Sequence, residues 1–481
     1  MNAALLGILS YLGLGVLGIL FGRGRLAAVL ALVAGGVTLS LWAPEFPEGF
    51  LGGPPLGIAL AGDFWALGIW GLALLLHAAV LLHGWKKEGL FHAIITVLIG
   101  TCLAGGVSRD LFNLYIVLEL ATLLSVILVA KEGRSPAVWA ALRYLLLAGV
   151  GMILYLFGLG LVYGRTGLLA VSALAHADFS IPSIRIGVGF LLVGAAVKTG
   201  VFLLGLWLPP AHGQAPTEVS ALLSGLVVKL GVMTMARLAE AFPVEPIVLA
   251  LGILTGFGGL IYAIWEQDLK VFLAYSTVSQ LGYMLLGLGL ENQEAGLFYA
   301  VAHGLFKGLL FLSAGSAIEG AGKRKISELR GGLPWPAVLG LALGAWAIAG
   351  LPPLAGFPGK YALALSSPIW AKGILLGLSL GTAASFSKLL PILQPKNGDQ
   401  AGGIFLLTAA ILGLGIWGIF LFPGLWRLNP WLEAVLPAGA GYGVYLVLRK
   451  VPAKIRRLPL DWAILSALLT SLFLIAVVLF A

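Results

Sequence analysis

Ionisable residues stand inside stretches of this sequence that are otherwise apolar. One acid and five lysines lie near the middle of such stretches or close to their ends: Glu119, Lys198, Lys229, Lys307, Lys360 and Lys388. A charge at the centre of a membrane helix costs about 2.5–3.5 kcal/mol on insertion scales. We therefore expect these groups to be paired, hydrated or neutralised, and to mark the path of an ion or a proton.

A buried lysine is suited to loading and releasing a proton. Burial disfavours the charged ammonium, whereas a carboxylate nearby favours it. If Glu119 pairs with Lys198, breaking that pair would lower the proton affinity of the lysine. Several such lysines, joined by water, would form a proton relay. Lys388 is more ambiguous, because it lies near a helix end and its side chain could simply reach the membrane interface.

Other polar groups extend this pattern. His303 and Lys307 are four residues apart and share one helix face, and histidine titrates close to physiological pH. A polar patch precedes them along the chain: Ser276, Thr277, Ser279 and Gln280. Four other histidines are interpreted as helix-end or loop residues without a transport role, namely His77, His83, His92 and His176.

The composition requires that membrane helices hold these residues. The chain has 481 residues, of which 60% are hydrophobic and 10% charged, and its mean hydropathy is +1.04. Soluble domains have about 45–50% apolar and about 25% charged residues. A soluble enzyme and a disordered chain are therefore excluded. The single Cys102 excludes a disulfide within the chain and any cysteine-based metal cluster.

We predict an all-α polytopic membrane protein with about 14–16 transmembrane helices. A span needs about 20 apolar residues, and the apolar runs are continuous rather than alternating as in β-barrels. The candidate spans are 2–21, 26–42, 63–83, 90–107, 111–130, 137–163, 185–208, 217–238, 246–265, 270–290, 296–317, 334–365, 371–393, 403–422, 432–448 and 462–480. One set of alternate loops has 17 basic residues, among them Arg23, Arg25, Lys86 and Lys87, and the other has 6, among them Arg109 and Arg237. This charge map predicts that the first set is cytoplasmic and that both termini lie outside.

A weak internal repeat divides the chain. Asp110-Leu111 and Asp268-Leu269 each open a span, and Tyr144, Gly149, Leu154, Gly160 and Gly167 recur 155 residues later. An odd number of helices per copy implies an inverted five-helix repeat, as in ion-coupled transporters. The predicted regions are 1–89 (N-terminal helices), 90–240 (first repeat), 241–395 (second repeat) and 396–481 (C-terminal helices).

Two proline pairs mark candidate broken helices. Leu208-Pro-Pro and Leu351-Pro-Pro lie in segments 208–216 and 350–359. Proline removes an amide donor and interrupts a helix, and non-helical backbone at membrane depth needs protein or water around it. The second segment lies inside a longer apolar stretch, which favours a real discontinuity. The first could equally be a helix that ends in a loop.

Motifs for soluble cofactors are absent from the sequence. There is no Walker A sequence for ATP, no glycine-rich fingerprint after a strand, and no histidine spacing typical of metal ligands. An ATP-driven pump is therefore disfavoured, and we expect no cofactor and no metal in this chain.

Longer motifs occur between about residues 60 and 395. They are Asp110-Leu-Phe-Asn-Leu-Tyr-Ile-Val-Leu-Glu119, Val197-Lys-Thr-Gly-Val201, Trp207-Leu-Pro-Pro-Ala-His212, Ala215-Pro-Thr-Glu-Val-Ser-Ala-Leu-Leu-Ser-Gly-Leu-Val-Val-Lys229, Asp268-Leu-Lys-Val-Phe-Leu-Ala-Tyr-Ser-Thr-Val-Ser-Gln-Leu-Gly-Tyr283, Ala302-His-Gly-Leu-Phe-Lys-Gly-Leu-Leu-Phe311 and Gly350-Leu-Pro-Pro-Leu-Ala-Gly-Phe-Pro-Gly-Lys360. With these residues the sequence resembles the antiporter-like subunits of respiratory complex I, membrane-bound hydrogenases and Mrp-type cation/proton antiporters, and most of all the Mrp D-type subunit.

The resemblance implies a 14-helix core with an inverted repeat and two broken helices. The family glutamate of the fifth helix matches Glu119. The family lysines of the seventh, eighth and twelfth helices match Lys198, Lys229 and Lys360, and its histidines match His303 and His212. One departure is Phe202-Leu-Leu-Gly205, where the family usually has Phe-Pro-Leu-His. The extra bend and one polar group of the family pattern are therefore missing beside the first break.

The sequence thus favours a proton-translocating subunit of a hetero-oligomeric complex in the cell membrane. Its expected partners are other membrane subunits and the lipid bilayer, and the driving force would come from a redox arm or from exchange against sodium. Three alternatives stay open: a transport module for another substrate such as inorganic carbon, a structural subunit without transport, and a quinone-reducing enzyme, for which the chain offers no redox centre. The sequence does not distinguish H⁺ from Na⁺ as the conducted ion.

Overall fold

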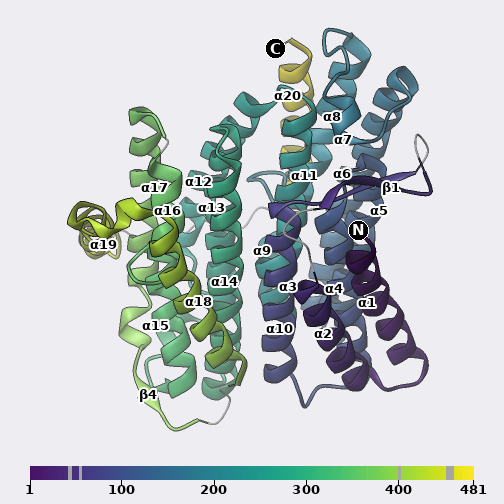
Figure 1. Ribbon diagram of the computed structural model, residues 1–481. Helices are drawn as coiled ribbons and strands as arrows, with labels where there is room; N and C mark the ends of the chain where they lie inside the picture. Colours follow the sequence, from purple (N-terminus) through teal and green to yellow (C-terminus); the bar gives the residue numbers. More distant parts are fainter. Residues whose placement is uncertain (42–45, 54–56, 366, 399–401, 451–459, 481) are drawn as a thin grey trace. The chain divides into compact units, whose positions relative to one another are not determined.

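The computed structural model describes residues 1–41, 46–53, 57–365, 367–398, 402–450 and 460–480 (Figure 1). Thirteen of the described helices are long and apolar enough to cross a membrane, and three shorter apolar helices accompany them, at Gly24–Ser40, Trp335–Ala349 and Leu465–Leu479. Together they account for each predicted span. The chain is therefore an all-α polytopic membrane protein, as the composition predicts.

The helices form two compact units. Unit 1 comprises Met1–Pro216, Leu226–Val248 and Leu458–Ala481, and unit 2 comprises Thr217–Gly225 and Leu249–Arg457. The elements of unit 1 are α1 (Asn2–Leu20), α2 (Gly24–Ser40), β1 (Phe46–Leu51), β2 (Ile58–Gly62), α3 (Phe64–His83), α4 (Gly89–Val107), α5 (Leu111–Ala130), α6 (Ser135–Thr166), α7 (Val171–Leu174), α8 (Pro182–Thr199), α9 (Leu208–Gln214), α11 (Val228–Ala241) and α20 (Leu460–Phe480). Strands β1 and β2 pair as an antiparallel hairpin.

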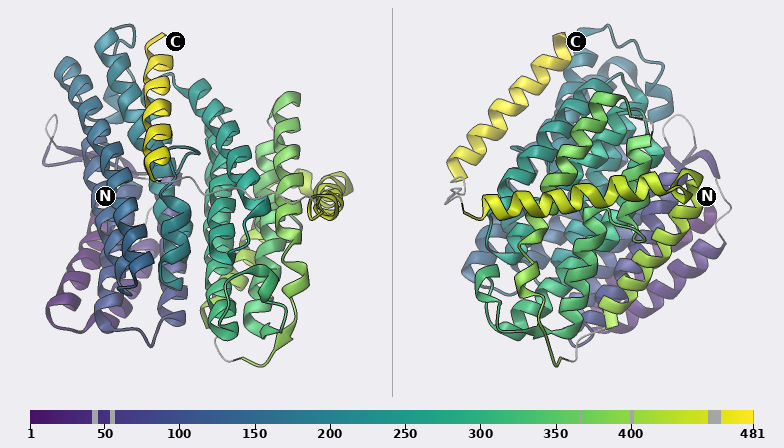
Figure 2. Two further views of the ribbon diagram at one scale, coloured as in Figure 1. Left: turned by 180° about the vertical axis from the view of Figure 1, so that it is seen from behind. Right: turned by 90° about the vertical axis from the view of Figure 1, so that its left-hand side faces the viewer.

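Unit 2 holds most of the remaining elements. They are α10 (Thr217–Leu222), α12 (Glu245–Trp265), whose first turn is assigned to unit 1, α13 (Leu269–Gly289), α14 (Gln293–Ala321), β3 (Leu333–Pro334), α15 (Trp335–Ala349), α16 (Gly356–Leu365), α17 (Ile369–Ser387), β4 (Pro395–Lys396), α18 (Gly402–Leu421) and α19 (Leu428–Leu448). Short β3 and β4 pair in parallel. Helix α19 has the length and composition of a span, yet it lies across the other helices of unit 2 and exposes nearly all of its surface (Figures 1 and 2).

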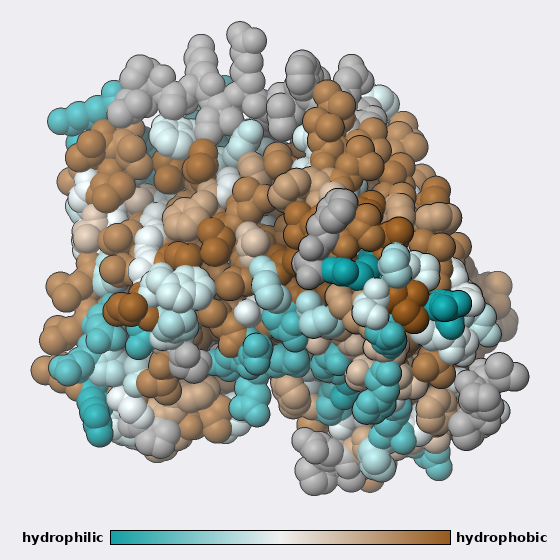
Figure 3. Space-filling view, turned by 90° about the horizontal axis from the view of Figure 1, so that it is seen from above, coloured by the Kyte–Doolittle hydropathy of each residue, from teal (hydrophilic) through white to brown (hydrophobic). Residues whose placement is uncertain are grey.

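Burial separates the inner helices of each unit from the outer ones. In unit 1, 89% of the residues in the most hydrophobic 18-residue stretch of α4 are buried, against 33% for α1 and 44% for α5. In unit 2, α13 and α14 are each 94% buried. The outer helices expose leucine, isoleucine and phenylalanine side chains, which a bilayer would cover. In a view along the helices, hydrophilic residues gather in patches between apolar areas (Figure 3).

The starts of α5 and α13 are built in the same way. Asp110 caps α5 by accepting a hydrogen bond from the amide of Asn113 (2.8 Å), and Asp268 caps α13 through the amide of Val271 (3.1 Å). The backbone of Asp110 also forms an isolated antiparallel β-bridge with Ala170, and the backbone of Asp268 forms one with Lys325. Carboxylates favour helix N-termini because they satisfy free amides there. The two units thus share local construction; the inversion of the second copy and the predicted region boundaries stay predictions.

Two helices are broken, and both breaks begin at a left-handed glycine. Helix α8 ends at Thr199, Gly200 has φ +86°, and α9 begins only at Leu208. Helix α15 ends at Ala349, Gly350 has φ +81°, and α16 begins at Gly356. Such backbone is strained for residues with a Cβ atom.

The first break lies earlier than the proline pair suggests. It spans 200–207, not 208–216, and Pro209-Pro210 stand in the first turn of α9. Proline is tolerated there because the first helical amides have no intrahelical acceptor in any case. The second break matches its predicted segment, since Pro352 and Pro353 lie between α15 and α16.

The second break gives a stability prediction. Gly350→Ala should lower the thermal midpoint of the purified protein, because its left-handed backbone costs about 1–2 kcal/mol with a Cβ atom and the added atom would lie 2.7 Å from Cδ of Lys360. Gly149→Ala on α6, where nothing lies within 4 Å, is the matched control and should not lower the midpoint. Equal midpoints for both variants would contradict this account.

Candidate functional site

Lys198 and Glu119 lie together in unit 1. The ammonium of Lys198, on α8, is 3.9 Å from Oε1 of Glu119 on α5. It also donates to the Leu118 carbonyl (3.3 Å) and to the Thr122 hydroxyl. Lys198 is 5% exposed, so these partners from α5 replace water around its charge.

The break that follows α8 supports Lys198. The indole N–H of Trp207 donates to the Val197 carbonyl (2.9 Å), which also accepts from the Gly200 amide (3.2 Å) where α8 ends. The Trp207 ring stacks on Tyr144 with a centroid distance of 3.9 Å. His212, on α9, is buried, and its Nδ1 lies 2.9 Å from the Leu208 carbonyl oxygen. Segment 200–212 therefore fixes the end of α8 that carries Lys198.

Lys229 is fully buried in the first turn of α11. A π-helical turn, Leu223–Val227, comes directly before it, and such turns are frequent at functional sites because they disturb the regular pairing of backbone groups. Two residues further on, Gly231 lets α11 touch α8: a Cβ atom there would lie 2.4 Å from the Thr199 amide nitrogen. Lys229 and Lys198 thus flank one close crossing of two helices.

In unit 2, Lys307 is held by the same kinds of hydrogen-bond acceptor as Lys198 in unit 1. Lys307, on α14, donates to the Leu273 carbonyl (2.9 Å) and to the Ser276 hydroxyl on α13. The Leu273 carbonyl also accepts from Thr277, just as the Leu118 carbonyl accepts from Thr122 in unit 1. Each lysine is thus held by a backbone carbonyl and a nearby hydroxyl. The residue after the accepting carbonyl differs, since Glu119 follows Leu118 and Ala274 follows Leu273.

A hydroxyl and amide network extends from this region of unit 2. Gln280 donates to the Thr382 hydroxyl (3.2 Å) and accepts from the Tyr299 hydroxyl. The Tyr283 hydroxyl lies 3.0 Å from that of Ser379, and the Tyr283 and Tyr299 rings are 5.3 Å apart.

Of this network, sequence reasoning found Gln280. It did not single out Tyr283, Tyr299, Ser379 or Thr382, because a hydroxyl in an apolar stretch does not by itself indicate which other helix it faces. One signal was available: Tyr299, His303 and Lys307 follow one another at four-residue intervals and therefore share one face of α14. His303 is fully buried on that face.

Lys360 occupies space that the second break provides. Its Nζ atom lies 4.8 Å from the Tyr283 ring centroid and 3.5 Å from the Ala349 carbonyl oxygen, which is left open where α15 ends. The lack of a Cβ atom at Gly350 makes room for the Lys360 stem. The break thus places an ammonium beside the tyrosines of the network.

Lys388 has a different environment. Its ammonium donates to the carbonyls of Ala263 (2.5 Å) and Glu266 (2.8 Å) at the C-terminal end of α12, and it lies over the Phe272 ring. Cations stabilise this end of a helix because its carbonyls are unpaired and the helix dipole is negative there. The structure therefore gives Lys388 a capping role, in place of the exposed interfacial position considered from the sequence.

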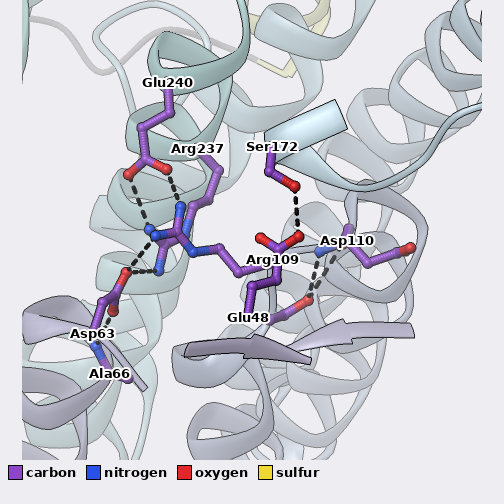
Figure 4. A network of polar contacts seen from close by, with 9 residues as sticks. Glu48, Asp63, Ala66, Arg109, Asp110, Ser172, Arg237 and Glu240 are labelled. Atoms are coloured by element: carbon purple, nitrogen blue, oxygen red, sulfur yellow. Dashed lines mark hydrogen bonds and ion pairs between the residues drawn. The ribbon is translucent and has the colours of Figure 1, made fainter. Parts of the chain in front are cut away.

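Four charged side chains form a closed ring in unit 1 (Figure 4). Arg237 contacts Asp63 (2.7 Å) and Glu240 (2.9 Å), and Arg109 contacts the same two carboxylates. The ring joins the starts of α3 and α5 to the end of α11. Arg109 is also held by its backbone, whose amide donates to Ala59 on β2 (2.9 Å).

The charged ring was not predicted. The charge map treated Arg109 and Arg237 as loop residues, but Arg237 lies inside α11 and is fully buried. His77 departs from its interpretation as a helix-end or loop residue, since it lies inside α3, whereas His92 lies in the first turn of α4 as expected; both are buried. Among the described residues, no three histidine, cysteine or acidic side chains are grouped to hold a metal ion.

Arg237→Met should destabilise the protein strongly. It leaves Asp63 and Glu240 sharing one guanidinium, and removing one partner of a buried ion pair costs about 3–5 kcal/mol. Thermal unfolding of the purified protein measures this loss. Arg165→Met, at an exposed position near the end of α6, is the control and should change stability by no more than about 0.5 kcal/mol. A small effect of Arg237→Met would mean that the ring does not hold α11.

Comparison with known proteins gives a consistent family. Residues 108–387 match the family described as NADH:quinone oxidoreductase/Mrp antiporter, TM. The chain is 34% identical to the N subunit of the NADH-quinone oxidoreductase of Desulforudis audaxviator, over 79% of this chain and 83% of that protein. It is 30% identical to the D-type subunit of the Na(+)/H(+) antiporter of Alkalihalophilus pseudofirmus, over 72% and 75%.

Solved structures show the same fold. A chain of the membrane-bound sulfane sulfur reductase, an archaeal respiratory membrane complex, aligns with a TM-score of 0.77 at 22% identity, covering 92% of this chain and 98% of that one. A chain of the Mrp complex from Dietzia sp. aligns with a TM-score of 0.76 at 22% identity and the same coverage. The chain belongs to the NADH:quinone oxidoreductase/Mrp antiporter transmembrane family.

Proposed function

We propose that this chain translocates protons as one subunit of a multisubunit complex in the cell membrane. The observation that carries the proposal is the environment of Lys198, a buried ammonium held by a carbonyl, a hydroxyl and the Glu119 carboxylate. A buried charge costs free energy in a membrane protein, and ionisable residues inside membrane segments commonly mark the path of a transported ion or proton. The relatives named as oxidoreductase and antiporter subunits support the same function.

Each unit carries its own part of the relay. In unit 1, Glu119 holds the charge of Lys198, and Lys229 lies just beyond the crossing of α8 and α11. His212 lies on α9, the helix that follows the break. In unit 2, Lys307 and His303 share a face of α14 with Tyr299, and the Gln280 network leads to Tyr283, beside Lys360. Hydroxyls that both donate and accept hydrogen bonds can pass a proton along such a series, with water in the gaps.

Protons fit these residues better than sodium does. Sodium, as a hard cation, prefers oxygen ligands such as carboxylates and carbonyls. Four positions of the proposed relay are lysines, which can lose and regain a proton but in their charged form would repel a metal cation. Among the described residues, no group of three His, Cys, Asp or Glu side chains converges. The proposed partners are other membrane subunits, which supply the driving force by electron transfer or by exchange of a second ion.

Lys198→Ala should reduce proton transport at least tenfold. Membrane vesicles containing the complete complex, with a pH-sensitive dye inside, measure the transport. Lys323→Gln, at an exposed position of unit 2, is the matched loss of one charge and should leave the rate unchanged. Co-purification of the partner subunits checks that the complex has assembled. Normal transport by an assembled Lys198→Ala complex would refute the relay.

Substitution of Lys388 distinguishes a helix cap from a relay group. Arginine keeps the charge and the donors to the α12 carbonyls but does not release its proton at physiological pH. We therefore expect Lys388→Arg to retain stability and transport. Lys388→Met should lower the thermal midpoint, because hydrogen bonds from charged groups contribute about 1.5–3 kcal/mol. If Lys388→Arg assembles yet loses transport, Lys388 belongs to the relay.

A further inference from the structure

Helices α1 and α2 of unit 1 lie side by side and are joined by a short turn (Figure 1). Side chains of both helices line a groove beside this turn. Its volume is about 450 Å³. Its walls include Leu17 and Phe21 from α1 and Leu26 and Leu30 from α2, and each of these side chains is between 46% and 71% exposed. Arg23, in the turn, also lines the groove. The groove therefore combines apolar walls with one cationic residue.

The turn is held in place by contacts between backbones. A Cβ atom at Gly24 would lie 1.8 Å from the Gly89 carbonyl oxygen, and one at Gly18 would lie 2.8 Å from the Ala27 Cβ atom. The α1–α2 turn thus packs directly on the start of α4. Because small residues occupy these contacts, the larger leucines and Phe21 are left on the outer side, where they form the walls.

Further positive charge gathers at this turn. The guanidinium of Arg25 donates to the Lys87 carbonyl (2.7 Å) and to the Lys86 carbonyl (3.3 Å), so the loop after α3 lies against the turn. Arg23, Arg25, Lys86 and Lys87 are all exposed, and among the described residues none of the four forms a salt bridge.

The nearby acid does not balance these charges. Glu88 accepts a hydrogen bond from Lys131 (2.6 Å), and this bond, together with the positive charge of Lys131, holds the pKa of Glu88 below its usual value. Glu88 is therefore ionised, and its charge is paired with that of Lys131. The charge map assigns this end of the helices to the cytoplasmic side, where anionic lipid headgroups attract basic residues.

We propose that this groove binds one molecule of an anionic phospholipid. One acyl chain lies between the leucines of α1 and α2, and the phosphate contacts Arg23 with Lys86 or Lys87. Charge complementarity selects the headgroup, because within the described part of the chain the four cations have no acidic partner of their own. The apolar walls select a lipid over free phosphate. Trp85, 48% exposed in the same loop, is a residue type that membrane proteins place at headgroup level.

Native mass spectrometry of the intact complex tests the headgroup. The complex is purified in detergent and supplied with phosphatidylglycerol or with phosphatidylcholine. We expect the chain to retain phosphatidylglycerol about tenfold better, and Arg23→Gln with Lys86→Gln to abolish that preference. Lys323→Gln with Arg330→Gln removes the same charge from an exposed loop of unit 2 and should keep the preference. Salt of about 1 M, where the Debye length is about 3 Å, should weaken retention.

The charge variants and the groove variants can each overturn the proposal. The charge variants contradict it if the Arg23/Lys86 variant still prefers phosphatidylglycerol, or if the control loses the preference equally.

Crosslinking tests whether the lipid occupies the groove. Cys102 is buried and is the sole cysteine of the sequence, so Leu26→Cys places one accessible thiol on the wall for a photoreactive label. Crosslinking to phosphatidylglycerol is expected; crosslinking to a partner subunit in its place would show that a protein covers the groove.

The groove can also be filled without changing its charge. Leu26→Trp adds bulk to an exposed wall position, so it should reduce retention of phosphatidylglycerol while thermal stability and assembly with partner subunits stay unchanged. Unaltered retention in this variant would place the lipid outside the groove. Proton transport is not needed for any of these measurements, so their outcome is independent of the proposed function.

Discussion

A charge in an apolar interior must obtain its partners from the protein, and this constraint shapes the sites described above. Lys198, Lys307, Lys360 and Lys388 each approach at least one backbone carbonyl oxygen. Ala349 and Ala263 offer carbonyls at or near a helix end, where the intrahelical donors run out. Leu118 and Leu273 lie inside helices, and each carbonyl there accepts both from the lysine and from a threonine hydroxyl. The broken helices and the hydroxyl-bearing faces are therefore the means by which ammonium groups can be held at membrane depth.

The sequence predicts the parts of this arrangement that depend on composition and on local spacing. The spans follow from continuous apolar runs, and the buried lysines stand out because charge is rare within them. The acidic caps of α5 and α13 are visible as Asp-Leu pairs. Gly200 and Gly350, which start the two breaks, are also visible in the sequence. The first break was nevertheless predicted at the proline pair after Leu208, because a proline pair in the first turn of a helix resembles one that interrupts a helix.

What could not be predicted depends on contacts between distant segments. The charged ring joins residues from three places in the chain, and nothing local separates Arg237 from a loop arginine. Lys388 caps a helix that ends 123 positions earlier, at Trp265. The Gln280 network needs hydroxyls from α13, α14 and α17, each unremarkable alone. In all three cases the decisive information is which helices are neighbours, and helix packing is not encoded in short motifs.

The two units solve the same electrostatic problem differently. A proton on Lys198 changes the net charge of the Lys198–Glu119 pair from negative to zero, so the protonated pair brings no net charge into the apolar interior. Lys307 is held by the matching carbonyl and hydroxyl, but Ala274 follows Leu273 where Glu119 follows Leu118. The residue that adjusts the proton affinity of Lys198 therefore has no counterpart at the matching position beside Lys307. Under the proposed function, this difference would let a partner subunit act on the proton of Lys198 through Glu119 while the acceptors that both lysines share stay in place.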